Sequence, residues 1–105
     1  MSVWICQDAA PHCDPNTMCD GCLSRELTAK RGQARVVGAV WAEEIAARHP
    51  DLRRQQAWPD TDVSRAIARR RVLALATDQR LGNALAESCL AGAAAWWAGR
   101  PERYR

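Results

Sequence analysis

Four of the five cysteines of this chain lie within its first 22 residues, and this clustering constrains the fold more than any other feature. They follow the pattern Cys6-x6-Cys13-x5-Cys19-x2-Cys22. Thiolate sulfur is a soft ligand, and four thiolates complete the tetrahedral coordination of Zn²⁺. The last pair has the two-residue spacing of a zinc knuckle, and Gly21 within it suits a tight turn. The spacing therefore predicts a structural zinc site with Cys6, Cys13, Cys19 and Cys22 as its ligands.

The segment that carries these cysteines, residues 1–22, has the composition of a loop. It contains four turn-forming residues, Pro11, Pro15, Asn16 and Gly21, and few apolar side chains. Metal binding would supply the folding free energy that burial cannot supply here. We therefore expect residues 1–22 to form a zinc-binding loop that is fixed to a helical domain of residues 23–105, as one compact unit.

Other interpretations of the cysteines remain open from the sequence. An iron–sulfur cluster also takes four cysteines, although this order, with the CxxC pair last, matches no ferredoxin spacing. Disulfides require an oxidising compartment, and the start of the chain shows no secretory signal. Unligated structural thiols are a third interpretation. His12 is an alternative to its neighbour Cys13 as a metal ligand.

From residue 23 onward the apolar residues recur with helical spacing. A first helix is expected over about residues 24–48, because five apolar positions fall on one narrow arc at ~100° per residue. These positions are Leu23, Leu27, Ala34, Trp41 and Ile45. Gly32 costs this helix about 1 kcal/mol relative to alanine, so a break at 30–33 is an alternative. The residue before Pro50 disfavours the α conformation, which predicts the end of the helix there.

A second helix is expected from Asp62 to about Thr77. Asp62 and its two predecessors are N-cap candidates, because their side-chain oxygens can accept hydrogen bonds from the first free N–H groups of a helix. Val63, Ile67 and Ala74 share one face, which we expect to be the apolar side of this helix.

A third helix is expected over about residues 78–98, and Gly99 and Pro101 behind it form a stop signal. Cys89 lies on its apolar side, where core packing is the expected role. The sequence thus predicts a mainly α fold: a small three-helix domain with an N-terminal Cys-rich metal-binding loop.

Catalytic patterns are missing from the sequence. His12 and His49 are the two histidines, and neither belongs to a Ser-His-Asp, Gly-x-Ser-x-Gly, P-loop or Rossmann pattern. A catalytic zinc keeps an open coordination position, which four cysteine ligands would fill. We expect a non-catalytic protein with no small-molecule substrate.

Positive charge is concentrated in the middle of the chain, whereas residues 1–22 hold three aspartates and no Lys or Arg. Arginines neutralise phosphates, and a tryptophan among them can stack on a base. The residues that could form such a surface are Arg53, Arg54, Trp58, Arg65, Arg69, Arg70 and Arg71. They predict a regulatory or accessory protein that associates with nucleic acid.

The alternative is a protein–protein adaptor, an inhibitor or a small subunit of a larger complex. Trp96 and Trp97 are adjacent in the third helix and cannot both face one core. We expect one of them, Trp97 in particular, at an interface, where tryptophan often anchors a partner.

The sequence also indicates where the protein works. The longest apolar run, residues 89–98, is about half the length that a bilayer requires, so no membrane association is expected. Together with the lack of a recognisable secretory signal, this predicts a cytoplasmic protein whose thiols are normally reduced.

Overall fold

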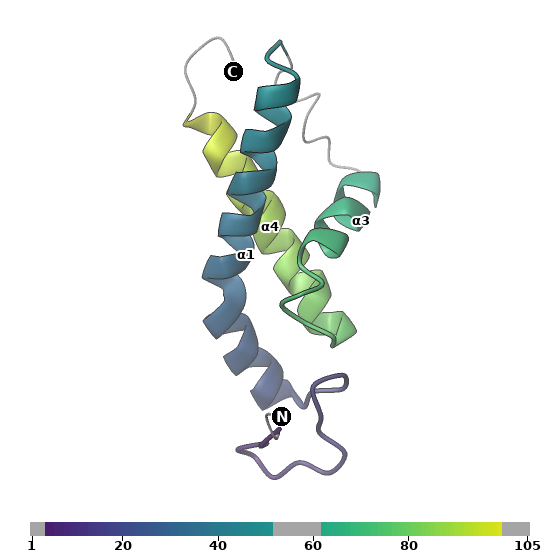
Figure 1. Ribbon diagram of the computed structural model, residues 1–105. Coiled ribbons are helices and arrows are strands. Elements are labelled where there is room, and N and C mark those ends of the chain that lie inside the picture. The colour runs from purple at the N-terminus through teal and green to yellow at the C-terminus, as the bar shows by residue number, and fades with distance from the viewer. Residues whose placement is uncertain (1–3, 52–61, 100–105) are drawn as a thin grey trace.

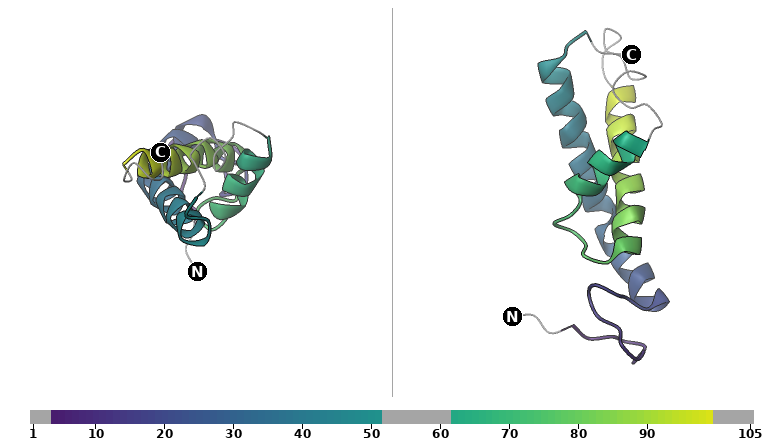
Figure 2. Two further views of the ribbon diagram at one scale, coloured as in Figure 1. Left: turned by 90° about the horizontal axis from the view of Figure 1, so that it is seen from above. Right: turned by 90° about the vertical axis from the view of Figure 1, so that its right-hand side faces the viewer.

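The computed structural model describes residues 4–51 and 62–99. These residues form three helices, α1 (Asp20–Arg48), α3 (Asp62–Arg71) and α4 (Gln79–Ala98), and no extended sheet. Helices α1 and α4 lie side by side and run in the same direction, and α3 lies across α4 (Figures 1 and 2). The Cys-rich loop precedes α1 at one end of this elongated bundle. The predicted mainly α fold with three helices and an N-terminal Cys-rich loop is confirmed.

Helix α1 is continuous over 29 residues, and the alternative of a break at 30–33 is not realised. At a rise of 1.5 Å per residue it is about 43 Å long, so it links the Cys-rich loop to the far end of the bundle. Its buried residues include Ala34 and Trp41, as the periodicity predicted, whereas the other three positions of the predicted arc are half-buried, namely Leu23, Leu27 and Ile45. The helix ends where His49 donates its backbone N–H to the carbonyl of Ile45 (2.8 Å).

Close contact between α1 and α4 depends on one glycine in each helix: Gly38 of α1 lies against the backbone of α4, and Gly92 of α4 lies against the backbone of α1. A Cβ on Gly38 would overlap the backbone carbonyl of Cys89, and a Cβ on Gly92 would overlap the backbone of Arg35. Backbone atoms cannot rotate away as a side chain can, so these positions require glycine. Cys89 itself is fully buried, which confirms it as a core residue. This burial raises the pKa of its thiol to about 11.

Helix α3 is shorter than predicted and buries a different face. It ends at Arg71 and not near Thr77, because the next residues form a tight turn with a hydrogen bond from the Leu75 N–H to the Val72 carbonyl (2.9 Å). Its buried residues are Ser64 and Ala68, two small side chains that let α3 lie close to α4.

The predicted apolar face of α3 is consequently wrong. Val63 is 68% exposed and Ile67 is 40% exposed, so neither belongs to the core. Periodicity placed these two on one face, but the small size of Ser64 and Ala68 on the neighbouring face decides which side packs.

The Cys-rich loop is attached to the start of α4 through Asp78. One carboxylate oxygen of Asp78 caps α4 by accepting the backbone N–H groups of Arg80 (2.8 Å) and Leu81 (3.1 Å). The other oxygen accepts the backbone N–H of Met18 (2.7 Å). Arg80 strengthens this attachment, because its guanidinium donates to the Met18 carbonyl and pairs with Asp20 (3.1 Å). Asp78 is 2% exposed, so this is a buried junction between loop and helix.

The structure corrects the expectation that Trp97 forms an interface. Trp97 is fully buried in the core, whereas its neighbour Trp96 is half-buried. Their rings lie 5.8 Å apart and are tilted by 53°. Since adjacent residues project in different directions from a helix, one of the pair had to leave the core, and it is Trp96.

None of the helices in the described part of the chain combines the length and the apolar character that a bilayer crossing requires.

Candidate metal centre

Two short turns and the start of α1 place the four cysteines. Between Cys6 and Cys13 the backbone turns back at Ala9 and His12, which both have left-handed φ angles of 50° and 60°. Between Cys13 and Cys19 the chain makes a hairpin, in which Asp14 and Thr17 exchange two backbone hydrogen bonds of 3.2 and 3.1 Å.

The side chain of Asp14 fixes this hairpin. Its Oδ1 accepts the backbone N–H groups of Asn16 and Thr17, both at 2.8 Å, which is the turn that aspartate favours before Pro15. The hairpin returns the chain to Cys19, which is the N-cap of α1. Cys22 follows in the first turn of the helix, so the CxxC pair lies at the positive end of the α1 dipole, where thiolates are favoured.

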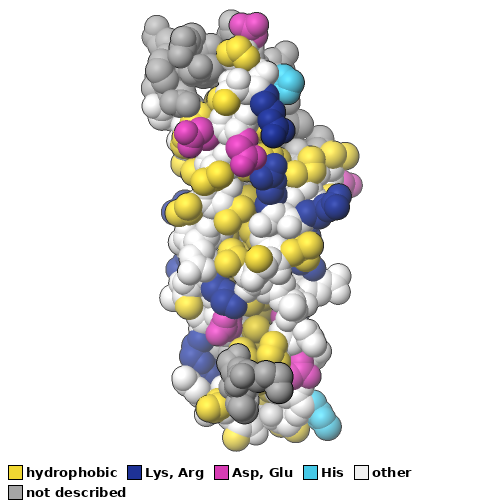
Figure 3. Space-filling view, in the orientation of Figure 1, with side chains coloured by type: hydrophobic (Ala, Val, Ile, Leu, Met, Phe, Trp, Pro, Cys, Tyr) yellow, Lys and Arg dark blue, Asp and Glu magenta, His cyan; other side chains and the backbone are white. Residues whose placement is uncertain are grey.

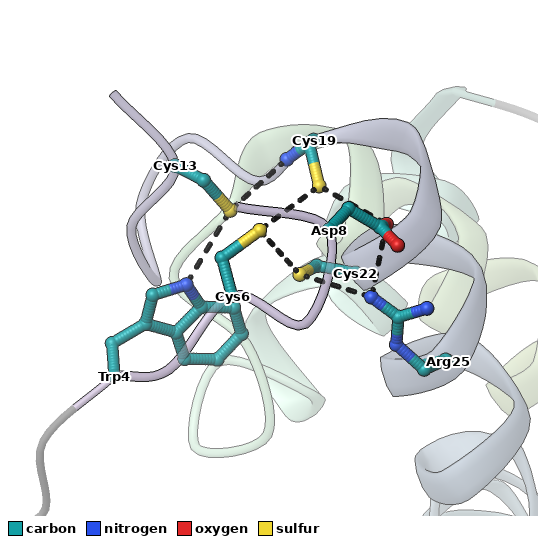
Figure 4. Close-up of polar contacts among 7 residues, drawn as sticks. All are labelled: Trp4, Cys6, Asp8, Cys13, Cys19, Cys22 and Arg25. Carbon is teal, nitrogen blue, oxygen red and sulfur yellow. Dashed lines mark hydrogen bonds and ion pairs between the residues drawn. The ribbon is translucent and has the colours of Figure 1, made fainter. Parts of the chain in front are cut away.

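These elements bring the four sulfur atoms together, as Figure 4 shows. All four Sγ atoms lie within 4.8 Å of one another. The Sγ of Cys6 lies 3.6 Å from that of Cys19 and 3.5 Å from that of Cys22. The cysteines are half-buried except for Cys22, which is buried.

The separation of the sulfurs suits one tetrahedral ion. With metal–sulfur bonds of about 2.3 Å, a regular tetrahedron places its sulfurs roughly 3.8 Å apart, close to the distances found here. An iron–sulfur cluster binds its cysteines through different iron atoms and needs a wider spacing of the sulfurs. His12 is exposed and does not belong to the group, so Cys13 and not His12 is the candidate ligand.

Hydrogen-bond donors surround the sulfur atoms. The indole Nε1 of Trp4 and the backbone N–H of Cys19 each donate to the Sγ of Cys13 at 3.4 Å. Arg25 donates to the Sγ of Cys22 at 3.5 Å, and the same guanidinium pairs with Asp8 at 3.1 Å. These donors would offset the negative charge that four thiolates place on a metal site.

The metal-free thiols differ in how readily they ionise. The backbone N–H of Ala10 lowers the pKa of the Cys6 thiol to about 6. Burial, together with the neighbouring thiols of Cys6 and Cys19, raises the pKa of the Cys22 thiol to about 12. Of these two thiols, Cys6 is therefore the one that ionises more readily. The pairing with Asp8 raises the pKa of Arg25, which stays charged beside the sulfurs.

The structure describes only part of the predicted arginine surface. Arg53, Arg54 and Trp58 lie outside the described residues. The other four arginines all belong to α3, and three of them have partners on neighbouring helices. Arg65 pairs with Glu87 (3.0 Å), Arg69 donates to the amide oxygen of Asn83 (2.7 Å), and Arg71 pairs with Glu44 (3.1 Å).

Arg71 also lies over the ring of Trp41, with its guanidinium carbon 5.7 Å from the ring centroid. Arg70 is exposed and makes no ion pair with another described residue. The α3 arginines are therefore on the surface, but most of them also hold α3 to the rest of the bundle.

Several residues around the sulfurs were not found from the sequence. Arg25 stands three positions after Cys22, so helical spacing alone could have placed it beside that sulfur. Trp4 and Asp8 contact the sulfurs because of the way the loop folds back on itself. Asp78 contacts the loop at Met18, which is 60 residues away in the sequence. No local pattern signals such contacts.

The chain was compared with protein-family models, with curated proteins and with solved structures, and none of the three comparisons gave a match.

Proposed function

We propose that this protein is a non-catalytic, zinc-binding helical protein with a regulatory or accessory role in the cytoplasm. The convergence of four Sγ atoms within 4.8 Å is the observation that carries the proposal. Four thiolates satisfy zinc completely, which leaves no open position for a substrate or a reactive water. The resident ion would then stabilise the fold by holding the loop to the start of α1.

Elemental analysis of the purified full chain tests the metal. We expect about one zinc per chain, because four cysteine ligands fill one tetrahedral site. Cys22→Ser should lose most of this zinc, since a hydroxyl is a poor replacement for a thiolate. The matched control is Cys89→Ser, which changes a cysteine outside the cluster and should keep the zinc content. A folded wild-type protein without metal contradicts the proposal, and iron in place of zinc contradicts the choice of ion.

As its partner we propose nucleic acid, bound through the exposed arginines of α3. Support comes from four arginines on one ten-residue helix, Arg65, Arg69, Arg70 and Arg71. Their ion pairs are largely exposed, with side chains that are 39% to 61% accessible in the pairs of Arg65 and Arg71. Exposed pairs contribute only about 0–1 kcal/mol, so phosphates can replace the carboxylates at little cost.

The salt dependence of binding tests this partner. We expect the affinity for a random-sequence duplex or single strand to fall steeply between 50 and 200 mM salt, by roughly tenfold or more for a few phosphate contacts. The double variant Arg69→Gln with Arg70→Gln should weaken binding and flatten this dependence. The control, Arg31→Gln with Arg48→Gln, removes the same charge from α1 and should change binding much less.

Absence of binding at micromolar protein in low salt would exclude nucleic acid. Equal effects of the two double variants would show that the attraction is general and does not involve α3. The remaining candidate is then the adaptor or subunit role, which the exposed Val36 and Val40 on α1 favour.

A further inference from the structure

An ion pair that belongs to no ligand lies directly against the sulfur atoms. The Oδ2 of Asp8 and the Nη2 of Arg25 are 3.1 Å apart. The same Nη2 lies 3.5 Å from the Sγ of Cys22, and the same Oδ2 lies 3.9 Å from the Sγ of Cys19. The Asp8–Arg25 pair therefore connects the loop to α1 beside both ligands of the CxxC pair, as Figure 4 shows.

Gly21 provides the space in which the carboxylate of Asp8 lies. It belongs to the first turn of α1 and has no left-handed φ, so the tight turn suggested by the sequence is not its role. A Cβ at this position would overlap the Oδ2 of Asp8 and would lie 3.4 Å from the guanidinium of Arg25. The glycine of the CxxC pair thus permits the Asp8–Arg25 pair to form.

Arg25 also lies where the most buried ligand can be reached from solvent. The side chain of Cys22 is buried, with 4% of its surface exposed. Cys22 and Arg25 both line a surface hollow of about 110 Å³. A chelator that reaches Cys22 through this hollow would have to displace the guanidinium of Arg25.

The two members of the pair have opposite effects on the charge of the site. Zinc with four thiolates carries a net negative charge. The carboxylate of Asp8 adds to this charge, whereas the guanidinium of Arg25 offsets it. Asp8 can therefore favour the bound metal only by holding Arg25 beside the sulfur of Cys22, which makes both of them positioning residues.

The Asp8–Arg25 pair contributes little to the stability of the fold. The side chain of Arg25 is 42% exposed and that of Asp8 is 50% exposed. On the face drawn in Figure 3, charged side chains of both signs lie at the surface around the end that carries the Cys-rich loop. Water and salt screen such exposed pairs, so variants of either residue are expected to fold.

We propose that the Asp8–Arg25 pair controls how long the protein retains its metal ion. The four thiolates bind the ion, and Arg25, held by Asp8, slows its release by shielding the Cys22 thiolate. This inference rests on the proposed zinc site and is independent of the proposed binding of nucleic acid.

The rate at which the zinc-loaded full chain loses its ion to an excess of a coloured chelator tests the proposal. We expect Asp8→Ala and Arg25→Met each to release zinc at least about tenfold faster than the wild type, because outer partners of metal ligands typically contribute roughly 10- to 100-fold to metal affinity. The matched control is Arg31→Met, which removes an exposed arginine from the same helix and should keep the rate of the wild type.

Gly21→Ala tests the route through Asp8. It should also speed release, although alanine favours the helix, because the added Cβ displaces the carboxylate of Asp8. In an Asp8→Ala background the same substitution should add nothing further. Gly32→Ala is the control, because its Cβ meets nothing within 4 Å, and it should release zinc at the rate of the wild type.

A spectrum of the Co²⁺-loaded protein separates an effect on the sulfur from an effect on the loop alone. Arg25→Met should move the sulfur-to-cobalt charge-transfer band to longer wavelength, because a thiolate without its cationic donor gives up an electron more easily. Arg31→Met should leave the band in place. A purely structural role of Arg25 in the loop would not move it.

The outcomes distinguish this proposal from the metal site on which it rests. A wild type that takes up neither zinc nor cobalt would overturn both. A wild type that binds the metal, with unchanged release from Asp8→Ala and Arg25→Met, would leave the metal site intact and overturn the role of the pair. An equal acceleration in Arg31→Met, or a cobalt band that Arg25→Met does not move, would also overturn that role.

Discussion

Replacing Asp78 with alanine is expected to lower the free energy of unfolding by about 2–4 kcal/mol. The change removes the N-cap of α4, worth about 0.5–2 kcal/mol. It also leaves the buried N–H of Met18 without its charged acceptor, a loss of roughly 1.5–3 kcal/mol. Denaturant unfolding of the metal-loaded protein, followed by circular dichroism, measures the loss.

Asp78→Asn separates the two contributions. Asparagine keeps one oxygen for capping α4, but its amide N–H₂ would face the N–H of Met18, so only the contact with the loop is lost. The control is Asp20→Asn, the same substitution at an exposed carboxylate that pairs with Arg80, where we expect a loss within about 1 kcal/mol. Equal small effects at both positions would show that the junction contributes little to stability.

The same carboxylate makes stability depend on pH. Burial alone would raise the pKa of Asp78, but the backbone N–H groups of Met18, Leu81 and Arg80 lower it further than burial raises it. A carboxyl group with a lowered folded pKa stabilises the protein above its unfolded pKa of about 4, and this stabilisation is lost as the pH falls through the folded value.

The difference in stability between wild type and Asp78→Asn should therefore be constant near neutral pH and shrink below about pH 4. Acid also displaces metal from thiolates, which lowers the stability of both proteins. The stability of the variant is therefore compared with that of the wild type at the same pH. A difference that grows in acid would contradict this assignment.

Gly38→Ala is expected to destabilise the protein by about 1–3 kcal/mol, although alanine is the better helix former. The added Cβ would overlap the carbonyl of Cys89, so α1 and α4 must move apart and lose contacts along their shared interface. The midpoint of denaturant unfolding in dilute protein measures the change.

Gly32→Ala is a matched control, because it makes the same substitution in the same helix where the added Cβ meets nothing. We expect it to stabilise dilute protein by up to about 1 kcal/mol. Close α1–α4 packing thus predicts that Gly38→Ala lowers the free energy of unfolding and that Gly32→Ala raises it. If both stabilise the protein, the two helices are not held together as closely as described.

The helices could be predicted from the sequence where local rules decide. The end of α1 before Pro50 and the core role of Cys89 follow from backbone sterics and periodicity, and both are found. The grouping of four cysteines was predicted because soft ligands at short spacing have few other uses in a reducing environment. The four Sγ atoms of this group do lie within 4.8 Å of one another.

The remaining features depend on contacts between distant residues. The sequence favours a longer α3, but the chain leaves the helix after Arg71, and Asp78 is placed to meet Met18. Lys30 also donates to the carbonyl of Leu75 (2.7 Å), which holds this turn against α1. Periodicity placed Val63 in the core, whereas packing through Ser64 and Ala68 leaves it in solvent. Such outcomes depend on which faces fit together, and a single sequence does not encode that locally.

The junction at Asp78 has a consequence for biosynthesis. All four thiol ligands leave the ribosome within the first 22 residues, whereas the carboxylate that receives Met18 is translated 60 positions later. Because domains acquire their long-range contacts only after the distant segments are made, capture of the ion can precede docking of the loop. A nascent chain that stops before Asp78 would carry its metal on a loop that still lacks its docking contact with α4.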